Sequence, residues 1–321
     1  MRNAIFYIAT VVIWGSTWIA IKFQLGTVHP MLSVGYRFAL AAGILLLWCA
    51  VNRLPMRFSL AEHGYMLLQG ALLFSLNYLL FYLAEQRITS GLAAVIFSSV
   101  LLMNMVNGAV FLGSPLDRRV LTGGILGLLG IALVFLPEIS SFTFDRGGLD
   151  GLLLSLAATF FASLGNILSA RNQRNNLPIV QSNAIGMSYG ALLMLAAAWL
   201  TGKSFIFENS PGYILSLVYL AIFGSIIAFG CYLSLIGRIG ADRAAYATLL
   251  FPIVALAIST VWEHYHWTRS AVVGVVLIVS GNFLMLHRRQ SDEKNSAWYL
   301  PRCITKNAGA RLGSALQGLI R

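Results

Sequence analysis

Two basic residues stand within or at the end of long apolar runs, where their charge could bind a solute. Arg37 lies six or seven residues into one run, and Lys22 ends another. A charge inside a bilayer costs several kcal/mol, so an ionisable group there indicates function by default. Arg37 could attract a carboxylate, or it could snorkel or bind the carbonyls of a neighbouring helix. Lys22 could bind an anionic group, or it could snorkel at the end of its helix.

Uncharged polar and aromatic residues near the middle of the runs could line a mostly apolar cavity with a few hydrogen-bonding groups. Tyr78 and Tyr82 share a helix face at a spacing of four residues, and Trp14 lies too deep for an interfacial belt. The alternative is that such groups join helices, at about 0.6 kcal/mol each. The candidates for the cavity are Trp14, Trp18, Asn77, Tyr78, Tyr82, Ser99, Asn104, Asn166, Tyr246 and Thr248. Ser98, Asn107, Ser225 and Tyr232 are similar residues.

Acidic residues avoid the middle third of every apolar run. Glu85 and Glu263 lie near outer ends, and Asp242 lies near an inner end. Proton-coupled carriers usually need a buried carboxylate whose pKa can change. Any transport by such a chain would therefore proceed without a carboxylate relay at the midplane, either facilitated or coupled through groups at the boundary.

Proline and glycine indicate where the backbone could bend or approach closely. Pro252 removes one hydrogen bond inside its run and is a candidate hinge. Gly123, Gly127 and Gly130 permit close helix approach. That approach could occur within one monomer or between two.

The composition says which environment must surround these residues. Of 321 residues, 10% are charged and 58% are hydrophobic, and the mean hydropathy is +0.77. Soluble domains carry about 25% charged residues. A soluble enzyme, a secreted disulfide scaffold and a disordered chain are therefore excluded, and lipid is the main solvent.

Nucleic acid, metal and cofactor partners are not expected. The net charge of +11 is scattered in ones and twos between apolar runs rather than gathered on a basic face. Cys49, Cys231 and Cys303 lie far apart without metal-ligand spacing, and no GxxxxGK[ST] motif is present. The first run lacks a small-residue cleavage site, so we interpret it as a retained span.

Windows of about 20 apolar residues predict an all-α integral membrane protein with ten transmembrane helices. The predicted spans cover residues 4–22, 31–52, 64–85, 90–113, 119–137, 149–170, 179–201, 212–236, 241–262 and 269–287. With the N-terminus inside, eleven Lys and Arg residues up to Arg289 lie on the cytoplasmic side and five on the other. Both termini are therefore predicted to be cytoplasmic.

An internal repeat appears when the chain is shifted by 151 residues. Ten of the 49 pairs from Arg87/Arg238 to Phe135/Leu286 are identical, Gly123/Gly274 and Gly130/Gly281 among them. Five spans separate the paired residues, so the two halves must enter the membrane in opposite directions. Inverted repeats are typical of secondary transporters, whose substrate site lies near the midplane. The predicted units are a first repeat at 1–137, a second at 149–287 and a basic cytoplasmic tail at 288–321.

Several short motifs resemble the EamA type of the drug/metabolite transporter superfamily, which has two five-helix repeats. They include Trp14–Gly15–Ser16–Thr17–Trp18, Tyr36–Arg37–Phe38, Ile88–Thr89–Ser90–Gly91–Leu92–Ala93–Ala94 and Gly281–Asn282. The chain departs from the pattern at Gly113–Ser114, where many relatives have Gly-Glu, and around Leu101, where they have proline. The resemblance implies transport of small organic molecules, often efflux of amino acids or metabolites.

We expect a secondary transporter of the inner membrane, a monomer or homodimer that moves small metabolites by alternating access around a midplane cavity. Amino acid or metabolite efflux is the leading prediction, and import or facilitated diffusion is the alternative. A non-transporting scaffold is a third possibility. An intramembrane enzyme would need clustered catalytic groups, and His264–x–His266 has no third ligand in view.

Overall fold

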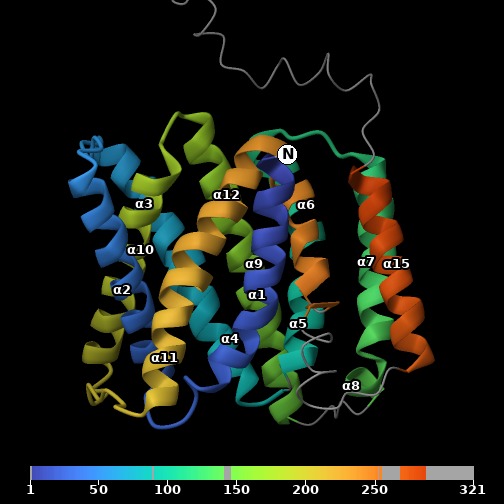
Figure 1. The fold of residues 1–321 in the computed structure, drawn as a ribbon, viewed down its shortest axis with the longest axis horizontal. Helices are drawn as coiled ribbons and strands as arrows, with labels where there is room; N and C mark the ends of the chain where they lie inside the picture. Colours follow the sequence, from blue (N-terminus) through green and yellow to red (C-terminus); the bar gives the residue numbers. More distant parts are fainter. Residues whose placement is uncertain (1, 89, 141–145, 252, 255–267, 287–321) are drawn as a thin grey trace, which may run out of the picture. The chain divides into compact units, whose positions relative to one another are not determined.

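The computed structural model describes residues 2–88, 90–140, 146–251, 253–254 and 268–286, apart from a few side chains within them. Every regular element in these ranges is a helix (Figure 1). The first half contains α1 (Arg2–Lys22), α2 (Pro30–Val51), α3 (Leu60–Ala71), η1 (Leu72–Leu76), α4 (Asn77–Glu85), α5 (Ser90–Ser98), α6 (Val100–Leu112), α7 (Arg118–Val134) and α8 (Leu136–Ser140). The second half contains α9 (Arg146–Arg174), α10 (Ile179–Leu200), α11 (Pro211–Tyr219), η2 (Leu220–Ile227), α12 (Ala228–Ile239), α13 (Ala241–Ala244) and α15 (Arg269–Leu286).

Local signals at the helix ends explain where several helices begin and end. Ser59 and Glu62 form a capping box at the start of α3, and Asp117 accepts a hydrogen bond from the backbone N–H of Arg119 at the start of α7. α6 ends at Gly113, whose φ of 61° favours glycine. His29 precedes α2, and its Nδ1 accepts a hydrogen bond from the backbone N–H of Met31. Burial lowers the pKa of His29, which suits a ring nitrogen that must stay unprotonated to accept.

Seven segments among the described residues are long and apolar enough to cross a membrane. They are Asn3–Lys22, Pro30–Val51, Leu60–Glu85, Val95–Leu112, Arg146–Arg174, Ile179–Leu200 and Pro211–Ile239. Each overlaps a predicted span. The helices over the predicted spans 119–137 and 269–287 are shorter, and most of the predicted span 241–262 lies outside the described residues.

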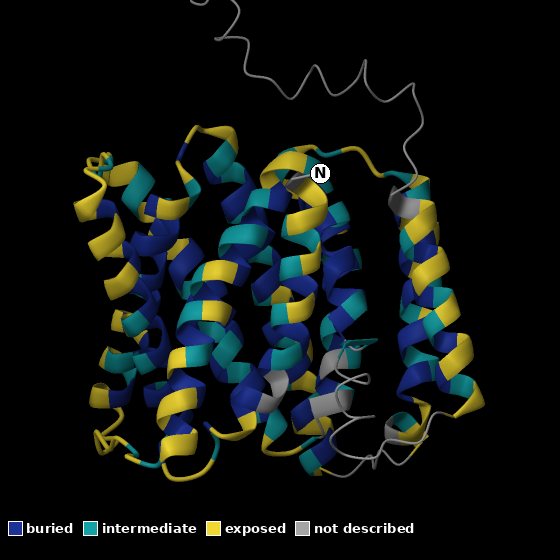
Figure 2. Ribbon diagram, in the orientation of Figure 1, coloured by how far each residue is buried: buried dark blue, intermediate teal, exposed yellow. Residues whose placement is uncertain are grey.

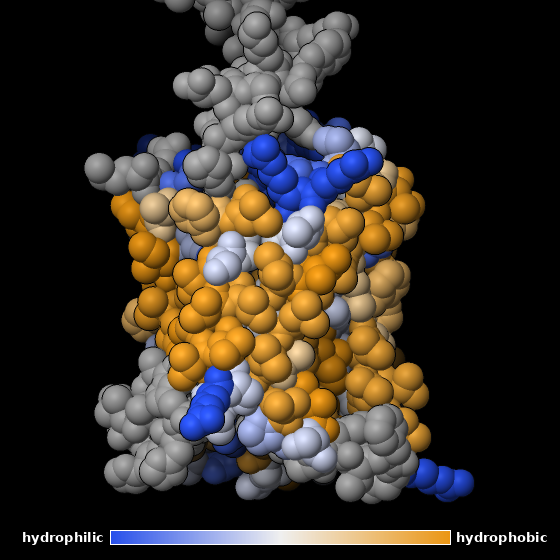
Figure 3. All heavy atoms as spheres, turned by 90° about the vertical axis from the view of Figure 1, so that its right-hand side faces the viewer, coloured by the Kyte–Doolittle hydropathy of each residue, from blue (hydrophilic) through white to orange (hydrophobic). Residues whose placement is uncertain are grey.

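Apolar side chains cover the outward helix faces, as lipid contact requires. Large apolar residues are exposed on many of the helices, for example Trp48 on α2 and Phe283 on α15. Exposed positions follow the outward sides of several helices (Figure 2). On the side that carries α7 and α15, a hydrophobic band separates hydrophilic patches at the two ends (Figure 3). The described part of the chain is therefore a multi-pass membrane protein.

Two segments of the wider π-helix interrupt the long helical stretches, and the 151-residue shift relates them. η1 shifted by 151 covers residues 223–227, which lie within η2. π-Helical turns are rare and occur frequently at functional sites. Each half of the chain thus contains the same irregularity, between α3 and α4 and between α11 and α12.

The repeated glycines lie at the contact between α7 and α15, which run side by side (Figure 1). A Cβ at Gly130 would lie 2.5 Å from the carbonyl oxygen of Gly274, and a Cβ at Gly123 would lie 2.7 Å from that of Gly281. Only glycine permits this backbone approach. The close approach that the sequence left open occurs within one chain, and each glycine meets the repeat partner of the other.

Candidate functional site

A cavity lies between helices of both halves. Its wall comes from α1, α2, η1, α4, α5, α9, α12 and the residues after α13. About 70 Å³ of the cavity is open to the centres of water molecules. One ordered water needs roughly 10–15 Å³ by this measure. The cavity therefore has room for several waters or a small solute. The residues that line it are Trp14, Thr17, Ile21, Arg37, Leu73, Asn77, Tyr78, Phe81, Tyr82, Glu85, Phe97, Ala162, Asn166, Phe229, Tyr232 and Phe251.

Arg37 is a buried cation on the cavity wall, with 1% of its surface exposed. Its Nε donates a 2.9 Å hydrogen bond to Oγ of Ser225, whose hydroxyl in turn donates to the carbonyl of Leu220. Its guanidinium carbon lies 4.6 Å from the ring centre of Tyr78, a cation–π distance. Among the described residues, no carboxylate lies within 4.0 Å of this guanidinium. The side chain lies inside the bundle and not at its surface.

The π-helix η2 forms the platform on which α1 and α2 place their polar groups. The indole N–H of Trp14 donates a 3.0 Å hydrogen bond to the carbonyl of Gly224, and Arg37 binds the next residue, Ser225. A Cβ at Gly224 would lie 3.2 Å from Nη2 of Arg37, so a small residue is needed there. Trp14 also contacts three aromatic rings that line the cavity, those of Phe229, Tyr232 and Phe251.

A polar cluster joins the halves at one side of the cavity. Nδ2 of Asn166 lies 3.3 Å from the hydroxyl of Tyr232 and 3.5 Å from Oδ1 of Asn104. Asn104 itself donates to the backbone carbonyl of Ala241. The cluster connects α6, α9, α12 and α13, and its member Asn166 reaches the cavity.

α4 presents one face to the cavity. Tyr78, Tyr82 and Glu85 follow one another at spacings of four and three residues, so they share a face of the helix. All three line the cavity. Tyr78 contacts Arg37, and Glu85 ends the helix about two turns further on.

Five of the lining residues carry a buried polar atom that has no hydrogen-bond partner within the described part of the chain. These atoms are Nη1 of Arg37, Oδ1 of Asn77, the hydroxyl of Tyr82, Oε1 of Glu85 and Oδ1 of Asn166. Buried polar groups are almost always hydrogen-bonded, so unpaired ones call for an explanation. All five residues line the same cavity, where a polar ligand could supply the missing partners.

The structure divides the predicted site residues into two groups. Trp14, Arg37, Asn77, Tyr78, Tyr82 and Asn166 line the cavity, and Asn104 lies behind Asn166. The other group lies elsewhere: Lys22 is exposed, Ser99 donates to the carbonyl of Ile96, Tyr246 packs on Gly123 and Thr248 donates to the carbonyl of Ala245. The side chain of Trp18 and the whole of Pro252 are outside the described residues.

Sequence reasoning missed several lining residues. Thr17, Phe81, Phe97, Phe229 and Phe251 lie on the wall. The sequence analysis treats Glu85 as an acidic residue at the end of its span and not as a cavity residue. Glu85 lies three residues after Tyr82 on the helix face of Tyr78 and Tyr82, so the spacing in the sequence indicates its position.

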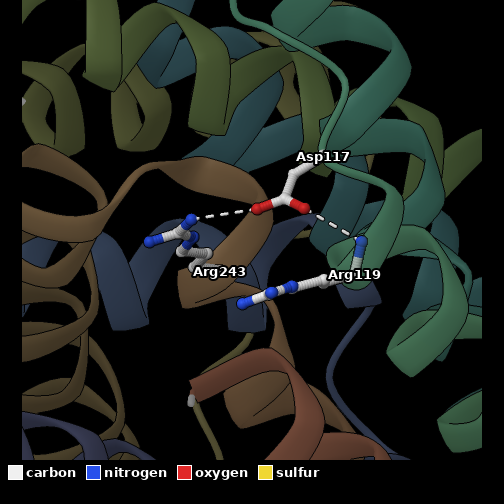
Figure 4. A network of polar contacts seen from close by, with 3 residues as sticks. All are labelled: Asp117, Arg119 and Arg243. Carbon is white, nitrogen blue, oxygen red and sulfur yellow. Dashed lines mark hydrogen bonds and ion pairs between the residues drawn. The ribbon is translucent and has the colours of Figure 1, made fainter. Parts of the chain in front are cut away.

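A polar network outside the cavity joins the two halves. Asp117 accepts hydrogen bonds from the backbone N–H of Arg119 at 2.9 Å and from the guanidinium of Arg243 at 3.0 Å (Figure 4). The second contact is an ion pair between the start of α7 and α13. Arg87 and Asp150 form another ion pair, between the end of α4 and α9.

Within the ranges that the structure describes, no group of three or more His, Cys, Asp and Glu side chains could hold a metal ion. His264 and His266 lie outside those ranges.

The helical fold and its apolar outer faces define the class of multi-pass membrane proteins, here with a cavity among the helices. The sequence profile of the EamA-like transporter family matches residues 1–136 and again 149–287. The chain therefore belongs to the EamA-like transporter family. Sequence analysis identified this family correctly.

Similar proteins support the assignment along nearly the whole chain. The probable amino-acid metabolite efflux pump of Salmonella typhimurium is 27% identical over 88% of this chain and 94% of its own length. The uncharacterized inner membrane transporter YedA of Escherichia coli K12 is 29% identical over 86% of this chain and 90% of its own. A crystal structure of another protein has the same fold, with a TM-score of 0.73 at 17% identity, covering 88% of this chain and 96% of that one.

Proposed function

We propose that this transporter exports small organic metabolites, amino acids first among them, by alternating access around the cavity. The observation that carries the proposal is that five residues with an unpartnered buried polar atom line one small cavity, half of whose lining residues are aromatic. Such a site orients a small amphipathic solute through a few hydrogen bonds. The efflux pump of Salmonella, similar over nearly the full length, supports the direction and the substrate class.

The proposed architecture is ten transmembrane helices in two inverted repeats, 1–137 and 149–287, with the tail 288–321 and both termini in the cytoplasm. Equivalent π-helices and the crossed glycine pairs support the repeat. The excess of basic residues on one side supports the orientation. The chain acts in this proposal as a transporter in the inner membrane and not as an enzyme.

Counterflow in liposomes tests the proposed function. The purified protein is reconstituted and screened against a panel of amino acids and other small metabolites, with and without a pH gradient. We expect exchange of at least one zwitterionic or amphipathic metabolite. Ala162→Trp, which fills the cavity from α9, should abolish that exchange.

A matched control separates blocking from misfolding. Ala132→Trp adds the same bulk on α7, outside the lining residues, and should leave exchange near the wild-type rate. No exchange by a folded wild-type protein would contradict the proposal and favour the scaffold. Uptake in cells, in place of export, would favour the importer.

A further inference from the structure

We propose that the cavity recognises the α-amino acid zwitterion at two points, with Arg37 binding the carboxylate and Glu85 binding the ammonium group. This inference rests on the proposed function and names the substrate class of the same cavity. The two residues belong to different helices, α2 and α4, and line one wall. They are the charged side chains among the lining residues that the structure describes.

Arg37 is prepared to receive an anion. Its Nε is occupied by Ser225, and its Nη2 lies against Gly224. Its buried Nη1 makes no hydrogen bond within the described ranges, and the phenols of Tyr78 and Tyr82 lie near the guanidinium. A buried charge is costly unless it is paired. The ring of Tyr78 offsets part of that cost from one side, and a carboxylate at Nη1 would make a charge-assisted hydrogen bond.

Glu85 is prepared to receive a cation. Its Oε1 is buried and has no hydrogen-bond partner in the described part of the chain. The charge of Lys22 acts on Glu85 from the end of α1, but no described ion pair joins them and the Lys22 side chain is exposed. An ammonium group has three N–H donors and no acceptor. The carboxylate of Glu85 and the amide oxygens of Asn77 and Asn166 supply acceptors on the same wall.

The helix register places Glu85 about two turns along α4 from Tyr78, the residue that Arg37 contacts. Tyr78 lies under Arg37, and Glu85 follows seven residues later, a rise of about 10 Å. Two charge-assisted hydrogen bonds of about 2.8 Å each occupy more than half of that length. An α-amino acid, whose carboxylate and ammonium are bonded to the same carbon, is short enough to fit between the two points. Aromatic walls then favour an apolar side chain on it.

Binding of matched probes to the full-length protein in nanodiscs tests the inference. The parent probes are leucine and phenylalanine, each compared with its amide, which lacks the carboxylate, and its N-acetyl derivative, which lacks the ammonium. We expect at least one parent to bind at least tenfold more tightly than both of its derivatives. Arg37→Gln should reduce the advantage over the amide to less than threefold. Glu85→Gln should do the same to the advantage over the N-acetyl derivative.

Control variants remove the same charges elsewhere. Arg57→Gln changes an exposed residue and Glu62→Gln a half-buried one, and both lie outside the cavity lining. Glutamine is accepted at the capping-box position of Glu62. Both should keep the full preference for the zwitterion. If Arg37→Gln fails to fold, Arg37→Lys keeps the charge and should retain a preference over the amide. The comparison of probes on the wild-type protein needs no variant at all.

The outcomes separate this inference from the proposed function. Binding of neither parent, or equal binding of parents and derivatives, overturns the zwitterion site, even if counterflow shows transport of other metabolites. The zwitterion site is also overturned if Arg37→Gln and Glu85→Gln each weaken the binding of parents and derivatives by the same factor. Charge-dependent zwitterion binding without any counterflow upholds the site and contradicts the transport function.

Discussion

The hydrogen bond between Ser225 and Arg37 holds a buried cation in place, and its removal should be measurable. In Ser225→Ala the guanidinium loses the acceptor of its Nε bond. Hydrogen bonds to charged groups contribute about 1.5–3 kcal/mol, so we expect a loss of that order in the free energy of unfolding. Reversible denaturation by SDS in micelles measures it.

Ser234→Ala is the matched control for this prediction. Its hydroxyl donates only to the carbonyl of Gly230, one turn back on the same helix. We expect a change well below that of Ser225→Ala. Equal losses for the two variants would mean that the bond to Arg37 contributes nothing special.

Single residues were predictable from the sequence where chemistry alone singles them out. Arg37 stands out as a charge inside an apolar run, and Tyr78 and Tyr82 share a visible helix face. Ser99 and Tyr246 have the same chemistry at a similar depth but do not line the cavity. The direction of a side chain around its helix depends on which neighbours the helix meets. A single sequence therefore indicates the depth of a residue in the membrane much better than the direction in which its side chain points from the helix.

The contact between α7 and α15 depends on glycine more than on any side chain. A Cβ at Gly130 would meet the backbone oxygen of Gly274, which cannot rotate away. Gly130→Ala should force the helices apart and lower the free energy of unfolding by about 1–3 kcal/mol, as overpacking does. Thermal unfolding in detergent measures the change.

Two other glycines provide graded controls. At Gly127 a Cβ would meet the end of the flexible Leu249 side chain, and at Gly43 it would meet nothing within 4 Å. We expect Gly127→Ala to cost less than Gly130→Ala. Gly43→Ala should stabilise the helix by up to about 1 kcal/mol, because alanine is the better helix former. Similar losses at all three positions would rule out the backbone contact as the cause.

Helix existence was predictable from apolar length, whereas helix irregularity was not. The π-helix η1 contains neither proline nor glycine, and η2 contains Gly224 but no proline. No local pattern common to both segments predicts their i→i+5 bonds. Gly224 and Ser225 of η2 nevertheless accept the hydrogen bonds of Trp14 and Arg37. An element that the sequence does not predict therefore positions two residues of the cavity wall.

At the scale of the whole molecule, the sequence predicted family, helical class and membrane location, because each follows from properties summed over many residues. The cavity was predicted as a kind of site, but its wall was only partly identified. It is assembled from both halves of the chain, and residues as distant as Trp14 and Gly224 meet there. Such contacts depend on how the halves pack together.

The proposed inverted repeat makes a prediction about which side of the membrane two loops face. Arg53 and Ser204 are related by the 151-residue shift, and both are exposed in loops. In an inverted repeat such positions must lie on opposite sides. The excess of basic residues predicts that Arg53 faces the cytoplasm and Ser204 the outside.

Cysteine labelling on intact cells tests this in a background of Cys49→Ala, Cys231→Ala and Cys303→Ala. We expect Ser204→Cys to react with a membrane-impermeant maleimide, and Arg53→Cys to react only after the membrane is permeabilised. Reaction of both from the same side would contradict the inverted repeat. If instead Arg53→Cys reacts on intact cells and Ser204→Cys reacts only after permeabilisation, the inverted repeat is kept and the termini lie outside. The chain would then be an exception to the positive-inside rule. The relative accessibility of one pair of equivalent residues therefore tests architecture and orientation independently.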